Sequence, residues 1–299
     1  MAPPMKAWIR LLRPKEYTKN FIIFLPLFFG MKFNQGELVA YSALAFLLFS
    51  LLASAVYIMN DLRDVEADRK HPVKRLRPIA AGLVSPRLAW VAVGGLFLCS
   101  LVPAFLWSRP LFVWMVVYLA VNLAYTHALK HVAILDVFIL ASGFVIRLYV
   151  GKAVTDTTLS HWIILMIFLG ALFIGFAKRR DDLLLSGGGE SVRRAISGYN
   201  LEFVHAAMVF MAAVTVVCYI LYTTSPEVVQ KWGEIFPSTA FVLFGILRWL
   251  QLAFVKNRTG SPVDIILHDR YILGSAGLFL LYYGFIIYFH YRFNMSFHG

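Results

Sequence analysis

The stretch LVAYSALAFLLFSLLASAVYIMNDLRDVEADRK, residues 38–70, joins two kinds of composition that decide the fold. Residues 38–59 are almost entirely apolar, and a helix needs about 20 such residues to cross the hydrocarbon core of a bilayer. The next ten residues, 60–69, carry three aspartates, one glutamate and two arginines. The stretch therefore predicts a transmembrane helix that ends in a polar cluster at the membrane surface.

The rest of the chain has the same apolar character. Of its 299 residues 60% are hydrophobic and only 15% are charged, and the mean hydropathy is +0.72. Soluble domains are about a quarter charged, so the composition excludes an ordinary soluble protein. Nine apolar stretches are candidate membrane spans: 19–33, 38–59, 86–107, 110–129, 132–151, 160–177, 203–224, 236–255 and 271–291. We therefore predict an all-α polytopic membrane protein with nine transmembrane helices in a single domain, residues 1–299.

The distribution of positive charge predicts the orientation. The formal net charge is +12, which in a soluble protein would suggest nucleic acid as a partner. If the N-terminus is inside, 21 of the 28 Lys and Arg residues fall in inside segments and only 5 in outside segments. Inside loops carry this excess in membrane proteins. We therefore expect a cytoplasmic N-terminus and active site, an outside C-terminus and no nucleic-acid partner, with the plasma membrane as the location.

The polar cluster after residue 59 has the chemistry of a metal site. On a helix, four of its oxygen-bearing side chains fall within an arc of about 100°: Asn60, Asp61, Asp64 and Asp68. Carboxylates and amides are hard oxygen ligands of the kind that Mg²⁺ prefers, and Glu66 points the other way. The alternative is a charged helix end that is paired with Arg63 and Arg69. Unpaired charge at a membrane boundary is costly, which favours the metal.

A basic run, HPVKRLRP at residues 71–78, follows the acidic cluster directly. Lys74 and Arg77 would place cations beside the proposed metal, and such an arrangement suits a diphosphate. The alternative is that these charges only fix the topology of the chain.

The motif NDxxDxxxD at residues 60–68 and its continuation DRKHPVKRLRPIAAG at 68–82 resemble the signature of the UbiA superfamily of intramembrane prenyltransferases. Further matches are Arg13-Pro14, Lys19-Asn20 and Pro26 in the first span, and Tyr125 and Lys130 after the fourth. The resemblance implies nine helices around a central cavity, with Mg²⁺ held by Asp61, Asp64 and Asp68. It also implies a substrate-binding set that comprises Lys19, Asn20, Lys74, Arg77, Tyr125 and Lys130.

The sequence departs from the aromatic prenyltransferases of this family after the sixth span. Their second aspartate motif is replaced here by GFAKRRDDL at 175–183, in which Lys178 and Arg179 precede Asp182. This pattern is similar to the branch that transfers 5-phosphoribosyl from phosphoribosyl pyrophosphate (PRPP) to a polyprenyl phosphate such as decaprenyl phosphate. The resemblance implies that Lys178, Arg179 and Asp182 bind substrate, and it points to cell wall biosynthesis.

Two other functions remain open at this point. One is an aromatic prenyltransferase of quinone biosynthesis, of the 4-hydroxybenzoate type, against which the altered second motif argues. The other is a transporter of a phosphorylated or lipid substrate. Transporter sites lie near the bilayer midplane, whereas the ionisable cluster here is at a membrane edge. Two weaker features are Arg147, inside the fifth span, and a possible lid formed by Asp264, Asp269 and Arg270.

Overall fold

The computed structural model describes residues 4–71, 73–127, 129–185, 198–256 and 268–294, and these residues form helices and turns without any strand. The all-α prediction is therefore confirmed for this part of the chain. The helices group into two compact units, Met1–Ser160 and His161–Gly299. The single transmembrane domain stays a prediction. Asp264 lies outside the described residues.

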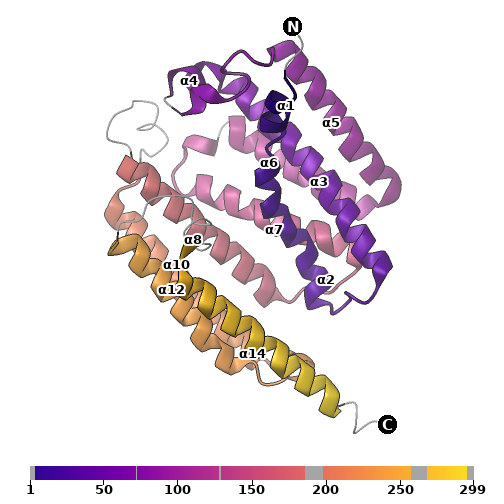
Figure 1. Cartoon of the computed structure of the whole chain (residues 1–299), viewed down its shortest axis with the longest axis vertical. Helices are drawn as coiled ribbons and strands as arrows, with labels where there is room; N and C mark the ends of the chain where they lie inside the picture. Colours follow the sequence, from indigo (N-terminus) through magenta and orange to yellow (C-terminus); the bar gives the residue numbers. More distant parts are fainter. Residues whose placement is uncertain (1–3, 72, 128, 186–197, 257–267, 295–299) are drawn as a thin grey trace. The chain divides into compact units, whose positions relative to one another are not determined.

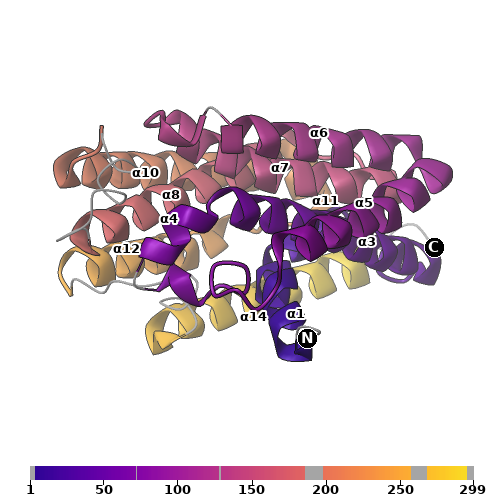
Figure 2. The ribbon, with the colours of Figure 1, turned by 90° about the horizontal axis from the view of Figure 1, so that it is seen from above.

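The first unit carries ten helical elements. They are α1 (Met5–Leu12), η1 (Pro14–Phe24), α2 (Leu25–Phe29), α3 (Gly36–Arg63), α4 (Val65–Lys70), η2 (Lys74–Leu76), α5 (Pro86–Trp107), α6 (Arg109–His127), η3 (Leu129–His131) and α7 (Leu135–Thr155). Figure 2 shows α3, α5, α6 and α7 running lengthwise beside one another, with α4 at one end of α3.

The second unit is built mainly from four long helices. Its described elements are α8 (His161–Leu185), α10 (Leu201–Thr224), α11 (Pro226–Trp232), η4 (Phe236–Ser238), α12 (Thr239–Phe254) and α14 (Arg270–Asn294). In Figure 1 the helices α8, α10, α12 and α14 lie alongside one another. At the start of α10 the Asn200 side chain accepts a hydrogen bond from Phe203 N at 2.7 Å, which caps the helix.

Seven helices in the described part of the chain are long and apolar enough to cross a membrane: α3, α5, α6, α7, α8, α10 and the η4–α12 segment. A shorter apolar helix covers Arg270–Ile286 within α14. The predicted count of nine is therefore not confirmed. The first predicted span, 19–33, is wrong as a regular helix, because residues there form η1 and the short α2. Pro26 has no N–H to donate, which breaks the α-helical ladder at this point.

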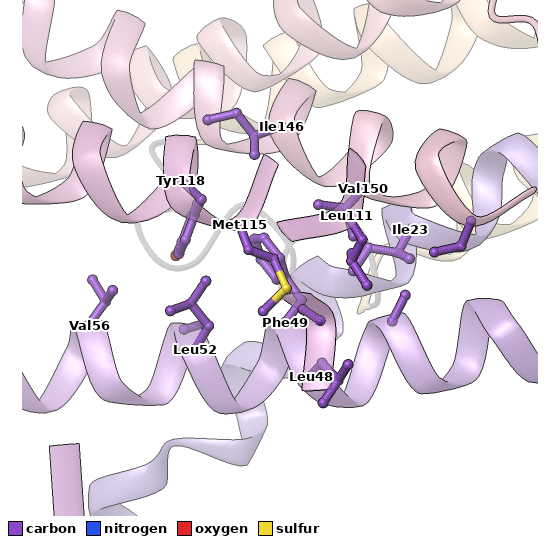
Figure 3. Close-up of a cluster of buried hydrophobic side chains, with 14 residues drawn as sticks. Ile23, Leu48, Phe49, Leu52, Val56, Leu111, Met115, Tyr118, Ile146 and Val150 are labelled. Atoms are coloured by element: carbon purple, nitrogen blue, oxygen red, sulfur yellow. The ribbon is translucent and has the colours of Figure 1, made fainter. Parts of the chain in front are cut away.

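The core of the first unit forms around α3. Phe49 and Leu52 project from α3 toward Met115 and Tyr118 of α6, as Figure 3 shows, and Leu48 belongs to the same buried cluster. The rings of Phe49 and Tyr118 lie 4.6 Å apart between centroids, a contact that adds to the burial of both side chains. This packing holds the middle of α3 against the middle of α6.

A close backbone contact holds η1 against α7. A Cβ atom added at Gly151 would lie 2.0 Å from the carbonyl oxygen of Ile23, so only glycine fits there. The irregular N-terminal segment is therefore packed onto the same core as α3 and α6.

Candidate functional site

The acidic motif straddles the end of α3. The helix ends at Arg63, Asp64 has φ −89° and ψ 8°, and α4 begins at Val65. The helical geometry used to place the side chains of residues 60–68 is therefore interrupted at Asp64. The helical register survives the interruption, because Asp64 N donates to Asn60 O at 2.9 Å and Asp68 N to Asp64 O at 2.8 Å.

Arg77 joins two of the three aspartates. Its Nη1 lies 2.7 Å from Asp68 Oδ2 and 3.1 Å from Asp61 Oδ1. Both carboxylates are buried, whereas the Arg77 side chain retains 29% exposure. The motif and the basic run after it thus meet directly, since the cation predicted beside the metal contacts the carboxylates themselves.

Arg13 brings a second cation to the same carboxylate. Its Nη2 lies 2.5 Å from Asp61 Oδ1, and its guanidinium lies over the ring of Tyr57 at 5.2 Å. Arg13 adopts a left-handed conformation with φ 53° at the end of α1. Non-glycine residues adopt this conformation at a cost, so the surrounding contacts must hold it in place.

Side-chain contacts link the motif to the end of α6 and to η3. Asn60 Oδ1 accepts from Thr126 Oγ1 at 2.6 Å, and Lys130 Nζ lies 2.9 Å from Asp64 Oδ1. Between them, Arg63 Nη1 lies 2.5 Å from His127 Nδ1. Every oxygen-bearing member of the predicted metal set on this face is therefore held by a side chain from another element.

The remaining carboxylate oxygens decide whether a metal fits. The cations take Oδ1 of Asp61, Oδ1 of Asp64 and Oδ2 of Asp68. The second oxygen of each carboxylate receives no hydrogen bond from the described part of the chain. The described part of the chain contains no group of three or more His, Cys, Asp or Glu side chains that lie closely enough together to hold a metal ion. The free oxygens of the three carboxylates are thus chemically suited to a divalent cation. A metal that binds all three would have to bring them closer together and compete with Arg77 for Asp61 and Asp68.

The other predicted substrate residues of the first unit differ in accessibility. Lys19 is exposed and pairs with Glu16 at 2.5 Å, and Lys74 is exposed. Tyr125 is half-buried.

His71 lies beside the exposed Lys74. Partial burial lowers the pKa of His71, as does the charge of Lys74, and the His71 Nδ1 atom accepts hydrogen bonds from the N–H groups of residues 73 and 74.

Asn20 and Arg147 form a buried polar pair in the first unit. Asn20 Oδ1 accepts from Arg147 Nε at 2.7 Å, while its Nδ2 donates to Ser50 Oγ at 2.9 Å. Arg147 is 4% exposed, donates to Gly143 O at 2.8 Å and has no carboxylate partner among the described residues. Three aromatic rings, including those of Phe49 and Tyr118, face its guanidinium between 5.1 and 5.6 Å. This arrangement gives Asn20 two structural partners.

The basic run of the second unit divides into two parts. Lys178 is exposed, and Arg179 Nη1 lies 2.8 Å from Asp182 Oδ2. Arg180 is buried, donates to the carbonyl oxygen of Ala253 on α12, and lies 3.2 Å from Nε2 of His205 on α10. Arg180 thus ties three helices of the unit together, while Lys178 faces outward.

The comparisons with known proteins decide the family. Residues 23–268 match the family model described as "UbiA prenyltransferase family". The chain belongs to the UbiA prenyltransferase family. It is therefore a multi-pass membrane protein, in agreement with its long apolar helices.

Two relatives of this UbiA-family chain carry the same name, decaprenyl-phosphate phosphoribosyltransferase. The protein of Mycolicibacterium smegmatis is 39% identical over 224 residues, which cover 73% of this chain and 70% of the relative. That of Mycobacterium tuberculosis is 35% identical over 268 residues, 88% of each chain. Among solved structures, a UbiA homolog from Archaeoglobus fulgidus bound to DMAPP and Mg²⁺ has a TM-score of 0.69 at 19% identity, covering 94% and 98% of the two chains. The last similarity establishes the UbiA fold.

Two residues of the UbiA-type cluster were missed as site members by the sequence analysis. Arg13 precedes the matched region and lies 48 positions before Asp61. Thr126 has no charge that would single it out, and its only signal is its position beside Tyr125. Arg13 is among the residues that match the family, but its contact with Asp61 and that of Thr126 with Asn60 became evident only because the fold brings distant segments to the end of α3.

Proposed function

We propose that this protein transfers the 5-phosphoribosyl group of PRPP to a polyprenyl phosphate of the decaprenyl type, releases pyrophosphate and depends on Mg²⁺. The observation that carries the proposal is the identity of 35–39%, over most of the chain, with proteins named decaprenyl-phosphate phosphoribosyltransferase. In the reaction an oxygen of the lipid phosphate forms a bond to ribose C1, and the bond from C1 to the pyrophosphate oxygen breaks.

The charge of the cluster supports this chemistry. Asp61, Asp64 and Asp68 carry three negative charges, and the cations on them, Arg13, Arg77 and Lys130, carry three positive charges. In the proposal the second oxygens of the three aspartates hold Mg²⁺, and Asn60 contributes its side-chain oxygen. The cluster would then carry an excess of two positive charges, which a pyrophosphate group neutralises.

The chain's own residues have separate roles in the proposed reaction. Bound Mg²⁺ supplies Lewis-acid stabilisation of the leaving pyrophosphate. Arg77 and Lys130 would shift from carboxylate to phosphate oxygens as the substrate binds, and Lys74 would add charge from the exposed loop. The lipid phosphate is already ionised near neutral pH, so the reaction requires no strong general base.

We assign recognition of the second phosphate of PRPP to the basic run at residues 178–179 on the family resemblance. Lys178 and Arg179 would bind the 5-phosphate, and Asp182 would hold Arg179 in position through the observed ion pair. We assign Lys19, Asn20 and Tyr125 to substrate binding on the family resemblance. Asn20 is buried between Ser50 and Arg147, so its proposed contribution requires movement of those partners.

An aromatic prenyltransferase is the second candidate, because the family model that matches residues 23–268 is described as a prenyltransferase family. The test supplies purified protein and Mg²⁺ with two substrate pairs in parallel. One pair is labelled PRPP with decaprenyl phosphate, and the other is polyprenyl diphosphate with 4-hydroxybenzoate. Label from PRPP should enter the organic phase. Turnover of the second pair alone would refute the phosphoribosyl proposal.

The location proposed for this reaction is the cytoplasmic face of the plasma membrane. The excess of Lys and Arg in alternate connecting segments supports it. Single cysteines introduced in residues 60–85 should react with an impermeant thiol reagent only after the cells are opened. A cysteine in place of Gln230 should react in intact cells, and the reverse pattern would contradict the orientation.

A further inference from the structure

The guanidinium group of Arg63 has no carboxylate partner in the described part of the chain. Arg63 is exposed at the end of α3, and two carboxylates lie close to it in sequence. Asp64 is the next residue, and Glu66 lies three positions further on, a spacing at which helical side chains commonly pair. Asp64 nevertheless pairs with Lys130, and Glu66 with Arg69. The acidic motif therefore leaves one of its cations without a counter-charge.

A residue of α6 holds the Arg63 side chain in one direction. Arg63 Nη1 lies 2.5 Å from Nδ1 of His127, and its Nη2 lies 3.5 Å from the backbone carbonyl oxygen of the same residue. A guanidinium group can only donate, so the ring nitrogen must accept and carries no proton. An imidazole acceptor orients the guanidinium group but removes none of its charge. The contact therefore prepares a cation for an anion that comes from outside the chain.

This contact lies beside the carboxylates that are proposed to hold Mg²⁺. Thr126, which precedes His127 in the chain, donates to Asn60 Oδ1 at 2.6 Å. Lys130, three positions after His127, lies 2.9 Å from Asp64 Oδ1. The oriented guanidinium group therefore lies between two contacts that involve the proposed metal ligands, at the same end of α6.

The charge of the cluster indicates which anion this cation suits. The three aspartates and the three cations that pair with them are balanced, so a bound Mg²⁺ would leave two positive charges in excess. A diphosphate ester carries about three negative charges near neutral pH, of which about two are on its terminal phosphate. One further positive charge is therefore needed to balance a diphosphate group, and Arg63 is the cation of the motif that has no other counter-charge.

We propose that Arg63, oriented by His127, binds the diphosphate group of the donor substrate beside the Mg²⁺ site. The identity of the donor as PRPP rests on the proposed function, whereas the preference for a diphosphate rests on the charge and position of Arg63. Arg63 is then a substrate-binding residue, and His127 is a positioning residue that acts through it. A guanidinium group can donate two parallel hydrogen bonds to phosphate oxygens, which an ammonium group cannot.

The first test measures binding without turnover, by calorimetric titration of the purified protein with pyrophosphate in the presence of Mg²⁺. Arg63→Gln should weaken binding about 10- to 100-fold, the effect of losing a hydrogen bond between charged groups. Arg63→Lys should fall between the two, because it keeps the charge but loses the planar fork. The matched control is Arg69→Gln, which should bind as the wild type does, because Arg69 pairs with the exposed Glu66. Equal affinity of Arg63→Gln and the wild type, or no binding by the wild type, would overturn the proposal.

The second test concerns the positioning role of His127. His127→Asn keeps an acceptor near the place of Nδ1 and should bind pyrophosphate nearly as the wild type does. His127→Leu removes the acceptor and should weaken binding about 2- to 10-fold, the cost of ordering one long side chain on binding. Their melting temperatures should match that of the wild type, because Arg63 and His127 are both exposed. Equal losses of affinity in the two variants would refute the positioning role.

A third measurement uses only the wild-type protein, so it does not depend on the folding of any variant. Phenylglyoxal modifies exposed arginines, and mass spectrometry of the digested protein reports each site. Pyrophosphate with Mg²⁺ should protect Arg63 but not Arg69, although both are exposed. Equal modification of Arg63 with and without pyrophosphate would overturn the proposal.

Steady-state kinetics separate the diphosphate from the lipid phosphate as the group that Arg63 binds. Arg63→Gln should raise the KM for PRPP and leave that for polyprenyl phosphate unchanged, and a rise for the lipid alone would overturn the proposal. If pyrophosphate binds through Arg63 but PRPP is not turned over, the proposed reaction fails and the diphosphate site stands. If PRPP is turned over but Arg63→Gln binds pyrophosphate as the wild type does, only the role of Arg63 fails.

Discussion

Replacing Arg77 by glutamine tests whether the acidic cluster holds a metal. Two buried carboxylates share the guanidinium, at 2.7 and 3.1 Å. A unit-charge pair at about 4 Å is worth about 4 kcal/mol at an effective dielectric constant of about 20. Because Arg77 keeps 29% exposure and Arg13 still neutralises Asp61, we expect Arg77→Gln to lower the free energy of unfolding by about 2–4 kcal/mol without metal.

Magnesium should reverse this loss. In the wild type, Mg²⁺ must compete with Arg77 for Asp61 and Asp68, whereas in Arg77→Gln the two carboxylates lack that cation. The melting temperature of the variant in EDTA should therefore fall by roughly 5–15 °C. Saturating Mg²⁺ should raise it more than it raises that of the wild type, since a ligand that binds only the native state stabilises it.

The assay is thermal unfolding in detergent, followed by intrinsic fluorescence with EDTA and across a Mg²⁺ titration. Arg69→Gln is the matched control, because Arg69 pairs with the exposed Glu66 and should contribute less than about 1 kcal/mol. If Mg²⁺ raises the melting temperature equally in the wild type and in Arg77→Gln, the metal does not bind these carboxylates. The assignment of Asp61 and Asp68 as ligands would then be refuted.

Three further predictions concern Asp64, Lys178 and Asp269. Asp64→Asn should nearly abolish transfer while Glu66→Gln, whose side chain is 75% exposed, should change the rate constant little; equal losses in a kcat/KM assay would contradict the site. Lys178→Ala should raise the KM for PRPP more than that for polyprenyl phosphate, as steady-state kinetics with each substrate varied would show. The hydrogen bond from Arg248 holds the pKa of Asp269 below its ordinary value, so its stabilising contribution is present above about pH 4 and is lost as the pH falls further. On acidification the wild type should therefore lose more thermal stability than Asp269→Asn, and equal losses would contradict the role of this pair.

The sequence predicts the long helices well because each needs only a continuous apolar run. The predicted span 38–59 lies within α3, and 86–107 coincides with α5. The first predicted span, 19–33, is wrong because apolar composition does not reveal that the segment is divided near Pro26 into η1 and α2. Residues 14–24 form a 3-10 helix that side chains from α3 and α7 hold in place. Those contacts are tertiary and leave no periodic signal.

The acidic motif was predictable in composition and in its nearby cation Arg77, but not in the partners that come from distant parts of the chain. Local spacing identifies Asp61, Asp64 and Asp68, and it also indicates that Glu66 points away, as its exposed pair with Arg69 confirms. The break at Asp64 was not predictable, because the residues around it are common within helices. Arg13 and Thr126 reach the motif from 48 and 66 positions away, and only the folded packing identifies such partners.

The pairing of Arg147 with Asn20 has a consequence for how the protein is made. An arginine at the centre of a transmembrane helix costs about 2.5–3.5 kcal/mol when the helix enters the membrane by itself. Asn20 lies 127 positions earlier in the chain, so the ribosome has delivered it before α7 leaves the translocon. The side chain of Asn20 is then available to accept a hydrogen bond from Arg147 as α7 inserts into the membrane. A chain that lacks its first thirty residues should therefore insert α7 poorly, even though α7 itself is unchanged.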